Sequence, residues 1–141
     1  MYIDPTRPQF DAFKDLDRNH PIDMLNLLSF NDLANYPGDH DLARDGLTGA
    51  EAYALYGKHS GPIFARVGGS IVWRGAFQGM VIGPDAAEWD AMFIARYPSA
   101  HAFLEMVADP DYQRAVIHRQ AAVRNSRLMR TRAAEIGTGF A

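Results

Sequence analysis

Apolar and aromatic residues occupy both faces of the stretch Trp89–Tyr97, which is the pattern of a strand covered on both sides. Pro98 cannot donate to a sheet ladder, so we expect the strand to end there. Ser99 is a typical helix N-cap, and apolar residues follow it at helical spacing: Phe103, Met106 and Val107. The pattern predicts a strand, a sharp stop and a helix over Ser99–Ala108, with Trp89 and Phe103 in the core.

Two further elements are predicted upstream. Pro21–Phe30 alternates as a strand, with Met24 and Leu28 on one face. Thr48 and Glu51 form a capping box, and an apolar stripe follows at helical spacing: Ala52, Tyr56, His59, Ile63 and Val67. Gly61-Pro62 predicts a kink or a restart in that helix.

The remaining elements are predicted from their boundaries. A long strand over Ser70–Ile82 pairs with the Trp89–Tyr97 strand through a turn at Gly83-Pro84-Asp85. Asp109 and Pro110 begin a helix over Pro110–Val123, and Arg127–Ala133 is the last strand. A short helix over Thr6–Asp17 precedes all of these.

This order of elements predicts an α+β, ferredoxin-like split βαβ fold (β-α-β-β-α-β) with an N-terminal helical arm. We expect an arm over residues 1–20, a single domain over 21–135 and a frayed tail over 136–141. Asn31–Gly46 is a polar loop, and loops of that length are often functional or mobile. The sheet face without helices is rich in apolar residues, which predicts a homodimer through that face.

Composition narrows the classes of function. The chain has 141 residues, a formal charge of −3 and no cysteine. The absence of cysteine excludes disulfides, zinc–thiolate sites and thiol nucleophiles. We expect no nucleic-acid partner, since there is no basic run, and no membrane span, since no stretch approaches ~20 apolar residues. The N-terminus lacks the pattern of a signal peptide, so we expect a cytoplasmic protein.

Several motifs together resemble the DUF1330 family. They are MLNLLSF, GAEAYALY, a GG pair before a long strand, WDAMFIARYPSAHAFLEM, DPDYQRA and HRQAAVRNSRL, spread from about Pro21 to Leu128. The run YPS-x-x-x-F followed by DP-x-Y is the most specific part. The resemblance implies the dimeric α/β-barrel superfamily, whose members include cofactor-free monooxygenases, isomerases and proteins with no established role. It therefore implies no cofactor and leaves the activity open.

Polar residues on the predicted core faces are the first candidates for a site. Asn26 shares a strand face with Met24 and Leu28, and a buried amide there either orients a ligand carbonyl or bonds to a neighbouring segment. Tyr53 and Tyr56 are neighbours on the first long helix. They either present hydroxyls to a cavity or are core residues with a solvated tip.

Four arginines lie in or beside apolar segments: Arg66, Arg74, Arg96 and Arg119. An arginine in such a place is a natural partner for a substrate carboxylate. The alternative for each is an ion pair within the chain or across the dimer, with Asp90 or Glu88 as partners. The resemblance to the family favours Arg66 and Arg119 as ligand-binding residues.

The histidines and the large aromatic residues give weaker indications of a functional site. His101 and Glu105 are four residues apart on one helix, but two ligands do not make a metal site, and we expect no metal. His59, on the predicted apolar face, is the one histidine we consider as a general base. Trp73, Trp89 and Tyr97 either wall an aromatic cavity or belong to the core or the interface.

Two functions remain open. The first is a small-molecule-binding homodimer, in one version a cofactor-independent enzyme acting on a small carbonyl or carboxylate compound. In that case Arg66 and Asn26 converge on a pocket between sheet and helices, unless Arg66 only neutralises its helix C-terminus. The second is a non-enzymatic dimer whose arm or Asn31–Gly46 loop contacts another protein. A cavity with convergent polar groups favours the first, and a filled core with a mobile loop favours the second.

Overall fold

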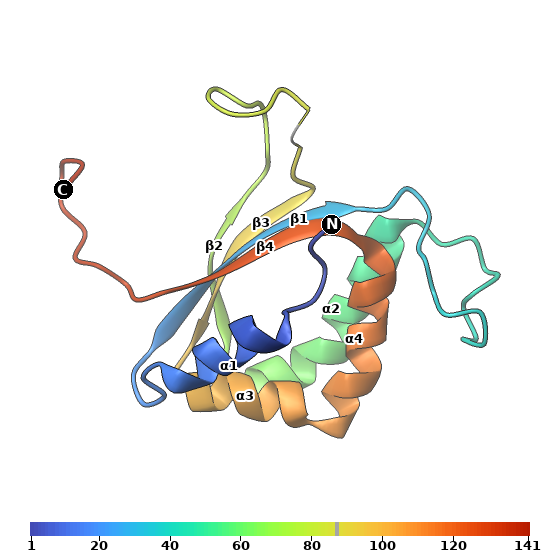
Figure 1. Ribbon diagram of the computed structural model, residues 1–141, viewed down its shortest axis with the longest axis horizontal. Helices are drawn as coiled ribbons and strands as arrows, with labels where there is room; N and C mark the ends of the chain where they lie inside the picture. The colour runs from blue at the N-terminus through green and yellow to red at the C-terminus, as the bar shows by residue number, and fades with distance from the viewer. Residues whose placement is uncertain (87) are drawn as a thin grey trace.

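The chain forms one sheet with its helices on one side. The computed structural model describes residues 1–86 and 88–141. In these residues the elements are α1 (Arg7–Asp15), β1 (Ile22–Phe30), α2 (Gly49–Arg66), β2 (Ser70–Gly75), β3 (Ala91–Tyr97), α3 (Ala100–Ala108), α4 (Pro110–Ala122) and β4 (Val123–Thr131). The four strands pair in antiparallel fashion in the order β2-β3-β1-β4. The order is the predicted ferredoxin-like arrangement (Figure 1).

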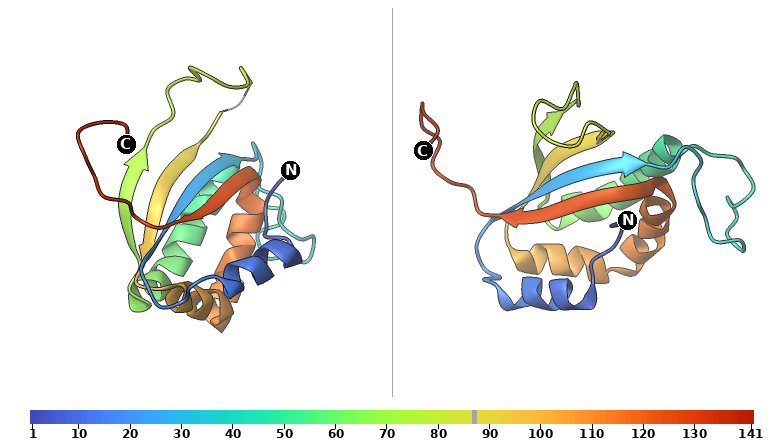
Figure 2. Two further views of the ribbon diagram at one scale, coloured as in Figure 1. Left: turned by 60° about the vertical axis from the view of Figure 1, so that its left-hand side comes forward. Right: turned by 45° about the horizontal axis from the view of Figure 1, so that its top comes forward.

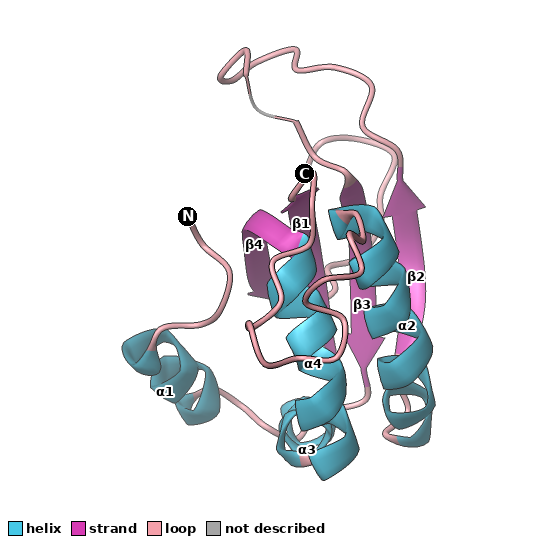
Figure 3. Cartoon of the chain, turned by 90° about the vertical axis from the view of Figure 1, so that its right-hand side faces the viewer, coloured by secondary structure: helices cyan, strands magenta, loops and turns pink. Residues whose placement is uncertain are grey.

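The helices cover one face and leave the other bare. α2 and α4 lie side by side on one face of the sheet, and α3 lies at the lower end of α4 (Figure 3). α1 packs near β4, and all four helices lie on the same side of the sheet in both views of Figure 2. We call the face toward the helices the inner face and the opposite face the outer face.

Two hydrophobic clusters fill the space between the inner face and the helices. The first, here the Met24 cluster, gathers buried residues of β1, α2, β3, α3 and α4, including Ile22, Met24, Ile63, Ala95, Tyr97, Met106 and Tyr112. The second, here the Leu28 cluster, includes Leu28, Tyr36, Ala52, Ala121, Ala122 and Val123. Phe93 packs against both clusters. Asn26 is the inner-face residue of β1 between Met24 and Leu28, so a polar side chain lies where the clusters meet.

A backbone junction ties three segments together. The Asn31 amide donates to the Ala122 carbonyl at 2.8 Å, and the Asn31 carbonyl accepts from the Gly49 amide at 3.1 Å. The Asn31 side-chain amide and the Asn35 backbone amide both donate to the Ala121 carbonyl, at 3.1 and 2.8 Å. The last carbonyls of α4 thus obtain the donors that a helix C-terminus lacks. The junction holds the end of β1, the start of α2 and the end of α4.

The first long helix does not restart at Gly61-Pro62, so that part of the prediction is wrong. α2 runs without a break from Gly49 to Arg66, with Pro62 inside it and the capping box of Thr48 and Glu51 at its start. A proline in a helix interior costs about 3 kcal/mol. Burial of Ile63 and Val67 beyond it, in the Met24 cluster, offsets that cost.

Two strand boundaries also differ from the prediction. β2 ends at Gly75 instead of Ile82, because its partner strand, β3, begins at Ala91 and Gly75, opposite Met92, is the last paired residue. β4 begins at Val123 instead of Arg127, since Val123 is both the C-cap of α4 and the partner of Phe30.

One of the two predicted core aromatics lies elsewhere. Trp89 precedes β3, is half-buried and belongs to neither hydrophobic cluster. The Arg127 guanidinium lies 6.0 Å from its ring centroid. Phe103 does pack against the Met24 cluster, with its ring 5.3 Å from that of Tyr97.

We predict that Gly49→Ala destabilises the protein by about 1–3 kcal/mol, the usual cost of overpacking. A Cβ at this position would overlap the Asn31 carbonyl oxygen and lie 2.9 Å from that of Ala122, and both are backbone atoms. Chemical denaturation measures the loss. The matched control is Gly57→Ala on the same helix, where a Cβ meets nothing within 4 Å and helix propensity favours alanine by about 1 kcal/mol. Equal stability of the two variants would contradict a tight junction.

Candidate functional site

Four tyrosines from three elements gather between the helices and the inner face. Tyr53 and Tyr56 come from α2, Tyr97 from β3 and Tyr112 from α4. The hydroxyls of Tyr56 and Tyr112 are hydrogen-bonded at 2.9 Å, and the Tyr97 hydroxyl donates to the Met106 sulfur at 3.9 Å. We call these four residues the tyrosine cluster. Its hydroxyls lie in an otherwise apolar interior and are therefore the main polar groups there.

Burial sets the protonation state of the cluster. Loss of solvation raises the pKa of Tyr53, Tyr97 and Tyr112, and neighbouring tyrosines raise these pKa values further. The positive charge of Arg119 opposes this, since it lowers the pKa of Tyr53 and of Tyr112 by a smaller amount. These three hydroxyls therefore stay protonated at neutral pH and act as hydrogen-bond donors.

The Tyr53 hydroxyl differs from its neighbours. No residue in the described part of the chain hydrogen-bonds to it, yet every fully buried side-chain nitrogen or oxygen there has a partner. The Tyr53 oxygen is therefore accessible to solvent. Its ring packs on Phe30 and Tyr56, with centroid distances of 4.9 and 5.4 Å, so the hydroxyl is held at the rim of the cluster.

Arg119, on α4, brings a largely buried positive charge to the same region. Its side chain is 13% exposed. Its guanidinium donates to the Ile3 carbonyl at 2.7 Å and to the Ser126 hydroxyl at 3.5 Å. The paired carboxylate is that of Asp4 at 3.8 Å, and Asp4 is itself half exposed. Arg119 is thus neutralised only weakly and from outside.

Asn26 and Arg74 belong to one row across the inner face. Asn26 is opposite Phe93 on β3, and Phe93 is opposite Arg74 on β2. The Asn26 amide donates to the Met24 carbonyl at 3.0 Å, so part of its polar capacity is satisfied within its own strand. Arg74 is near enough to lower the pKa of Tyr53 slightly against the effect of burial. The row therefore borders the tyrosine cluster.

Arg66 has a partner other than the one we expected. Its guanidinium forms an ion pair with the N-cap carboxylate of Asp109 at 2.5 Å, and its side chain is 56% exposed. The convergence of Arg66 with Asn26 is not found, since the Arg66 guanidinium pairs with Asp109 while the Asn26 amide donates to the Met24 carbonyl. The reason is that Arg66 is in the last turn of α2, next to the loop that begins α4, so a nearby carboxylate pairs with it.

Two other predicted residues lie on the outer face. Trp73 is opposite Ile94 on that face and is 45% exposed, so it is remote from the tyrosine cluster. Arg96 makes a two-point ion pair with Asp23, at 2.7 and 2.9 Å, instead of pairing with Asp90 or Glu88. The alternative of an intrachain ion pair was right for Arg96, although its partner was not foreseen.

A second group of polar side chains was missed by the sequence analysis. A depression of about 520 Å³ between α2 and α4 is lined by His40, His59, Pro62, Ile63, Asp111, Arg114, Ala115, Ile117 and His118. His59 is exposed there instead of facing the core, and its ring stacks on that of His118 at 5.2 Å. The fold of residues 31–48 onto α4 brings His40 to this place. Only the helical spacing of Asp111, Arg114 and His118 could have indicated it.

Across residues 1–86 and 88–141, no three histidine, cysteine or acidic side chains are arranged to hold a metal ion. None of the helices described combines the length and the hydropathy needed to cross a bilayer.

We predict that the stability of the protein falls as the pH rises above about 10, where tyrosines of the unfolded chain ionise. The buried hydroxyls stay protonated in the fold, so the unfolded state alone loses protons and is favoured. Tyr112→Phe should reduce this loss by up to about 1.4 kcal/mol per pH unit, measured by urea unfolding at several alkaline pH values. A native protein whose tyrosines all titrate near pH 10 by ultraviolet absorbance would contradict the burial.

Comparison with known proteins places the chain in a family. No protein with a curated description matches it. A crystal structure of a protein of unknown function from Rhodopseudomonas palustris is 51% identical, covers 96% of this chain and 98% of its own, and has a TM-score of 0.88. The methylated form of that protein gives 50% identity, coverage of 97% and 98%, and a TM-score of 0.90.

A distant structure shares only the fold. SnoaB, a cofactor-independent oxygenase from Streptomyces nogalater, is 15% identical, covers 85% of this chain and 99% of its own, and has a TM-score of 0.52. The profile described as "Domain of unknown function (DUF1330)" matches residues 43–131. The chain therefore belongs to the DUF1330 family, as its motifs had suggested.

Proposed function

We propose that this protein is a small-molecule-binding homodimer that accepts a small carbonyl or carboxylate compound at the rim of the tyrosine cluster, where the edge of the inner sheet face meets the helices. The observation that carries the proposal is the tyrosine cluster with Arg119 beside it. A structural core has little use for four hydroxyls and a weakly neutralised guanidinium in one place. Burying such groups costs free energy unless they make hydrogen bonds.

The chemistry of these groups suits an oxygen that gains negative charge. Protonated tyrosine hydroxyls donate to a carbonyl oxygen, and a buried arginine stabilises an enolate or carboxylate electrostatically. Both effects are stronger where water is excluded. Such a site promotes enolisation without a cofactor. Enolisation is therefore the reaction that we propose for it. Asn26, at the border of the cluster, would then fix the orientation of the ligand.

The position of Tyr53 supports entry from the edge of the sheet. Its hydroxyl is accessible, and Arg74 on the edge strand β2 carries a second positive charge nearby. An anionic compound approaching this edge would meet Arg74 first and the Tyr53 hydroxyl next. The loop between β1 and α2 is tied by the Ala34–Leu47 hydrogen bond and by the Leu33–Thr48 bridge. That anchoring weighs against the alternative of a free loop that contacts other proteins.

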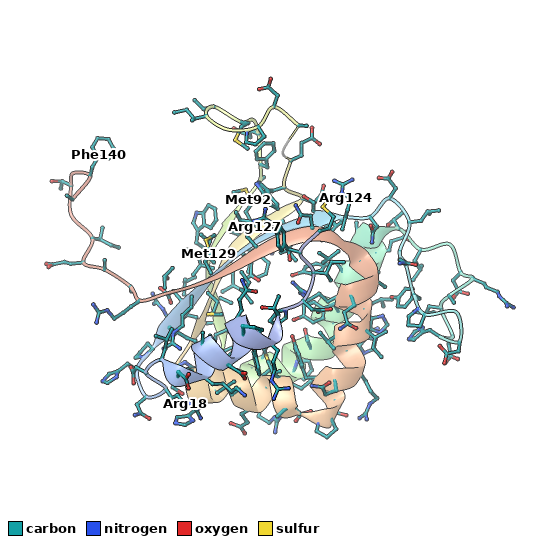
Figure 4. The ribbon with its side chains drawn as sticks, viewed as in Figure 1. Arg18, Met92, Arg124, Arg127, Met129 and Phe140 are labelled. Carbon is teal, nitrogen blue, oxygen red and sulfur yellow. The ribbon has the colours of Figure 1, made fainter. Side chains whose placement is uncertain are left out.

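The outer face supports self-association. Its helix-free surface carries a row of apolar side chains from all four strands: Leu25, Leu27, Trp73, Met92, Ile94 and Met129. Met92 and Met129 project from the side of the sheet opposite the helices (Figure 4). Trp73 and Met129 are 45% and 42% exposed, which is costly for large apolar side chains in one patch. A second copy packed on the same face by a two-fold axis would cover it.

We predict that a compound from a panel of small 2-oxo acids and 1,3-dicarbonyls raises the melting temperature of the protein. Tyr53→Phe should weaken its binding about 5- to 10-fold in calorimetry, the effect of one hydrogen bond, without lowering the melting temperature of the free protein. Tyr2→Phe, on the surface, is the matched control. Deuterium exchange at the carbon next to the carbonyl, followed by NMR, tests for enolisation. An unchanged affinity in the Tyr53→Phe variant would contradict binding at this site.

We predict that the protein elutes as a dimer at micromolar concentration in size exclusion with light scattering, and that Met92→Glu converts it to a monomer. A carboxylate in the centre of an apolar interface leaves a buried unpaired charge, which costs several kcal/mol. Ala54→Glu, on the exposed side of α2, is the control and should leave the dimer intact. A wild-type protein that is monomeric under these conditions would rule out the interface.

A further inference from the structure

We propose that the depression between α2 and α4 is a second binding site, specific for a small organic anion that carries a carboxylate or phosphate group on an apolar body. Three histidines define its polar end, where His59 on α2, His118 on α4 and His40 of the β1–α2 loop come together. The ring centroids of His40 and His118 are 5.8 Å apart, and those of His59 and His118 are 5.2 Å apart.

The tautomer of His40 follows from its backbone contact. Its Nδ1 lies 3.0 Å from the backbone amide of Leu42, which can only donate. Nδ1 therefore accepts, and in the neutral ring the proton is on Nε2. The ring of His40 also stacks on Tyr36 at a centroid distance of 4.6 Å, which holds its orientation. His40 thus presents an N–H donor to the depression that it lines.

His118 is held in the same tautomer by Tyr36. The Tyr36 hydroxyl lies 2.6 Å from Nδ1 of His118, and burial raises the pKa of this tyrosine, so the hydroxyl keeps its proton. Tyr36 is 8% exposed, and a buried hydroxyl proton needs an acceptor. We therefore assign Tyr36 as the donor and Nε2–H as the form of His118. Two imidazoles now offer donors to one space.

This donor arrangement decides between a cation and an anion. A metal ion requires lone pairs on the ring nitrogens that face it, whereas His40 and His118 have used theirs at Nδ1. A carboxylate or phosphate oxygen accepts such N–H groups. Arg114 adds a guanidinium at the same wall, paired with Asp111, the one acidic residue that lines the depression.

The other walls define the rest of the ligand. Pro62 and Ile63 of α2 face Ala115 and Ile117 of α4, so the depression is apolar away from the histidines and the Asp111–Arg114 pair. A volume of about 520 Å³ is in the range of small-molecule sites. An anion with a hydrocarbon or aromatic body matches both parts. None of the tyrosine cluster lines this depression, so the site is independent of the function proposed above.

The pH dependence has a defined sign. Burial, together with the charges of His59 and His40, lowers the pKa of His118, so the ring of His118 is neutral at pH 7 and above. A bound anion favours the imidazolium form, and the ring that can take up the proton without losing a contact is His59, because a donor already faces Nδ1 of His40 and of His118. The affinity for the anion should therefore increase as the pH falls from 7.5 to 5.5. The contribution of the Asp111–Arg114 ion pair should not change over this range.

The first experiment tests the tautomers without a ligand. Nitrogen-15 NMR of the histidine side chains at alkaline pH should show His40 and His118 protonated at Nε2. Tyr36→Phe should raise the Nδ1–H fraction of His118 several-fold and leave the other histidines unchanged. A wild-type His118 protonated at Nδ1 would overturn the assignment, and with it the anion site.

The second experiment tests binding with phenylacetate and with inorganic phosphate as probes. Saturable NMR shifts of His40, His59 and His118, and an affinity at least fivefold higher at pH 5.5 than at pH 7.5, are expected for phenylacetate. His59→Gln should weaken binding at least threefold, whereas His101→Gln, on the exposed side of α3, should not. Equal losses for both variants would indicate general charge attraction and overturn the site. One-to-one zinc binding that shifts the same three rings would also overturn it, in favour of a metal site.

Discussion

The backbone junction at Asn31 is the constraint on which the rest of the structure depends. It supplies donors to the last carbonyls of α4, sets the first residue of α2 and fixes where β1 ends. Only glycine fits at position 49, since any side chain would overlap the Asn31 carbonyl. Because α2 begins here and α4 ends here, these four hydrogen bonds hold the two helix ends next to each other and next to the end of β1. The depression between the two helices and the orientation of Tyr53 and Tyr56 are set by the same contacts.

The core carries a polar layer where its two hydrophobic clusters meet. Along the inner face of β1, apolar residues are interrupted once, at Asn26, and the tyrosine cluster faces this region from the helices. The polar groups of this layer are almost all hydrogen-bonded, which limits the free-energy cost of burying them. Its two exceptions are the accessible Tyr53 hydroxyl and the weakly paired Arg119. A ligand that bonded to both would complete the hydrogen bonding of the layer, which is why we consider this the principal site.

Local sequence patterns predicted the order of the elements and most of their boundaries. The capping residues Thr48, Ser99 and Asp109 begin the helices where the structure has them, because an N-cap acts within one turn. Contacts between segments far apart in the sequence could not be predicted from these local patterns. Arg66 pairs with Asp109 only because α3 turns the chain back toward the end of α2, and β2 ends early because its partner strand β3 begins only at Ala91.

The same distinction holds for the candidate sites. Tyr53, Tyr56 and Tyr97 lie in one cluster with Arg119 near it. Helical spacing made Tyr53 and Tyr56 neighbours, whereas Arg119 was favoured by the resemblance to the family. The histidine depression could not be found in this way. His40 and Tyr36 belong to a loop without periodicity, and their contact with His118 spans 82 positions in the case of Tyr36. Such a contact follows from loop anchoring, which sequence periodicity does not encode.

The direct passage from α4 into β4 has a mechanical consequence. Val123 is at once the helix C-cap and the first strand residue, so no flexible linker separates the two elements. A tilt of α4 would therefore act directly on the β1–β4 ladder, whose register already shifts between Ser29 and Phe30 beside the Val123 pair, and which carries Met129 on the outer face. A ligand in the depression between α2 and α4 and a partner on the outer face would therefore both act on α4 and β4. By thermodynamic linkage, binding at one place would change the affinity at the other.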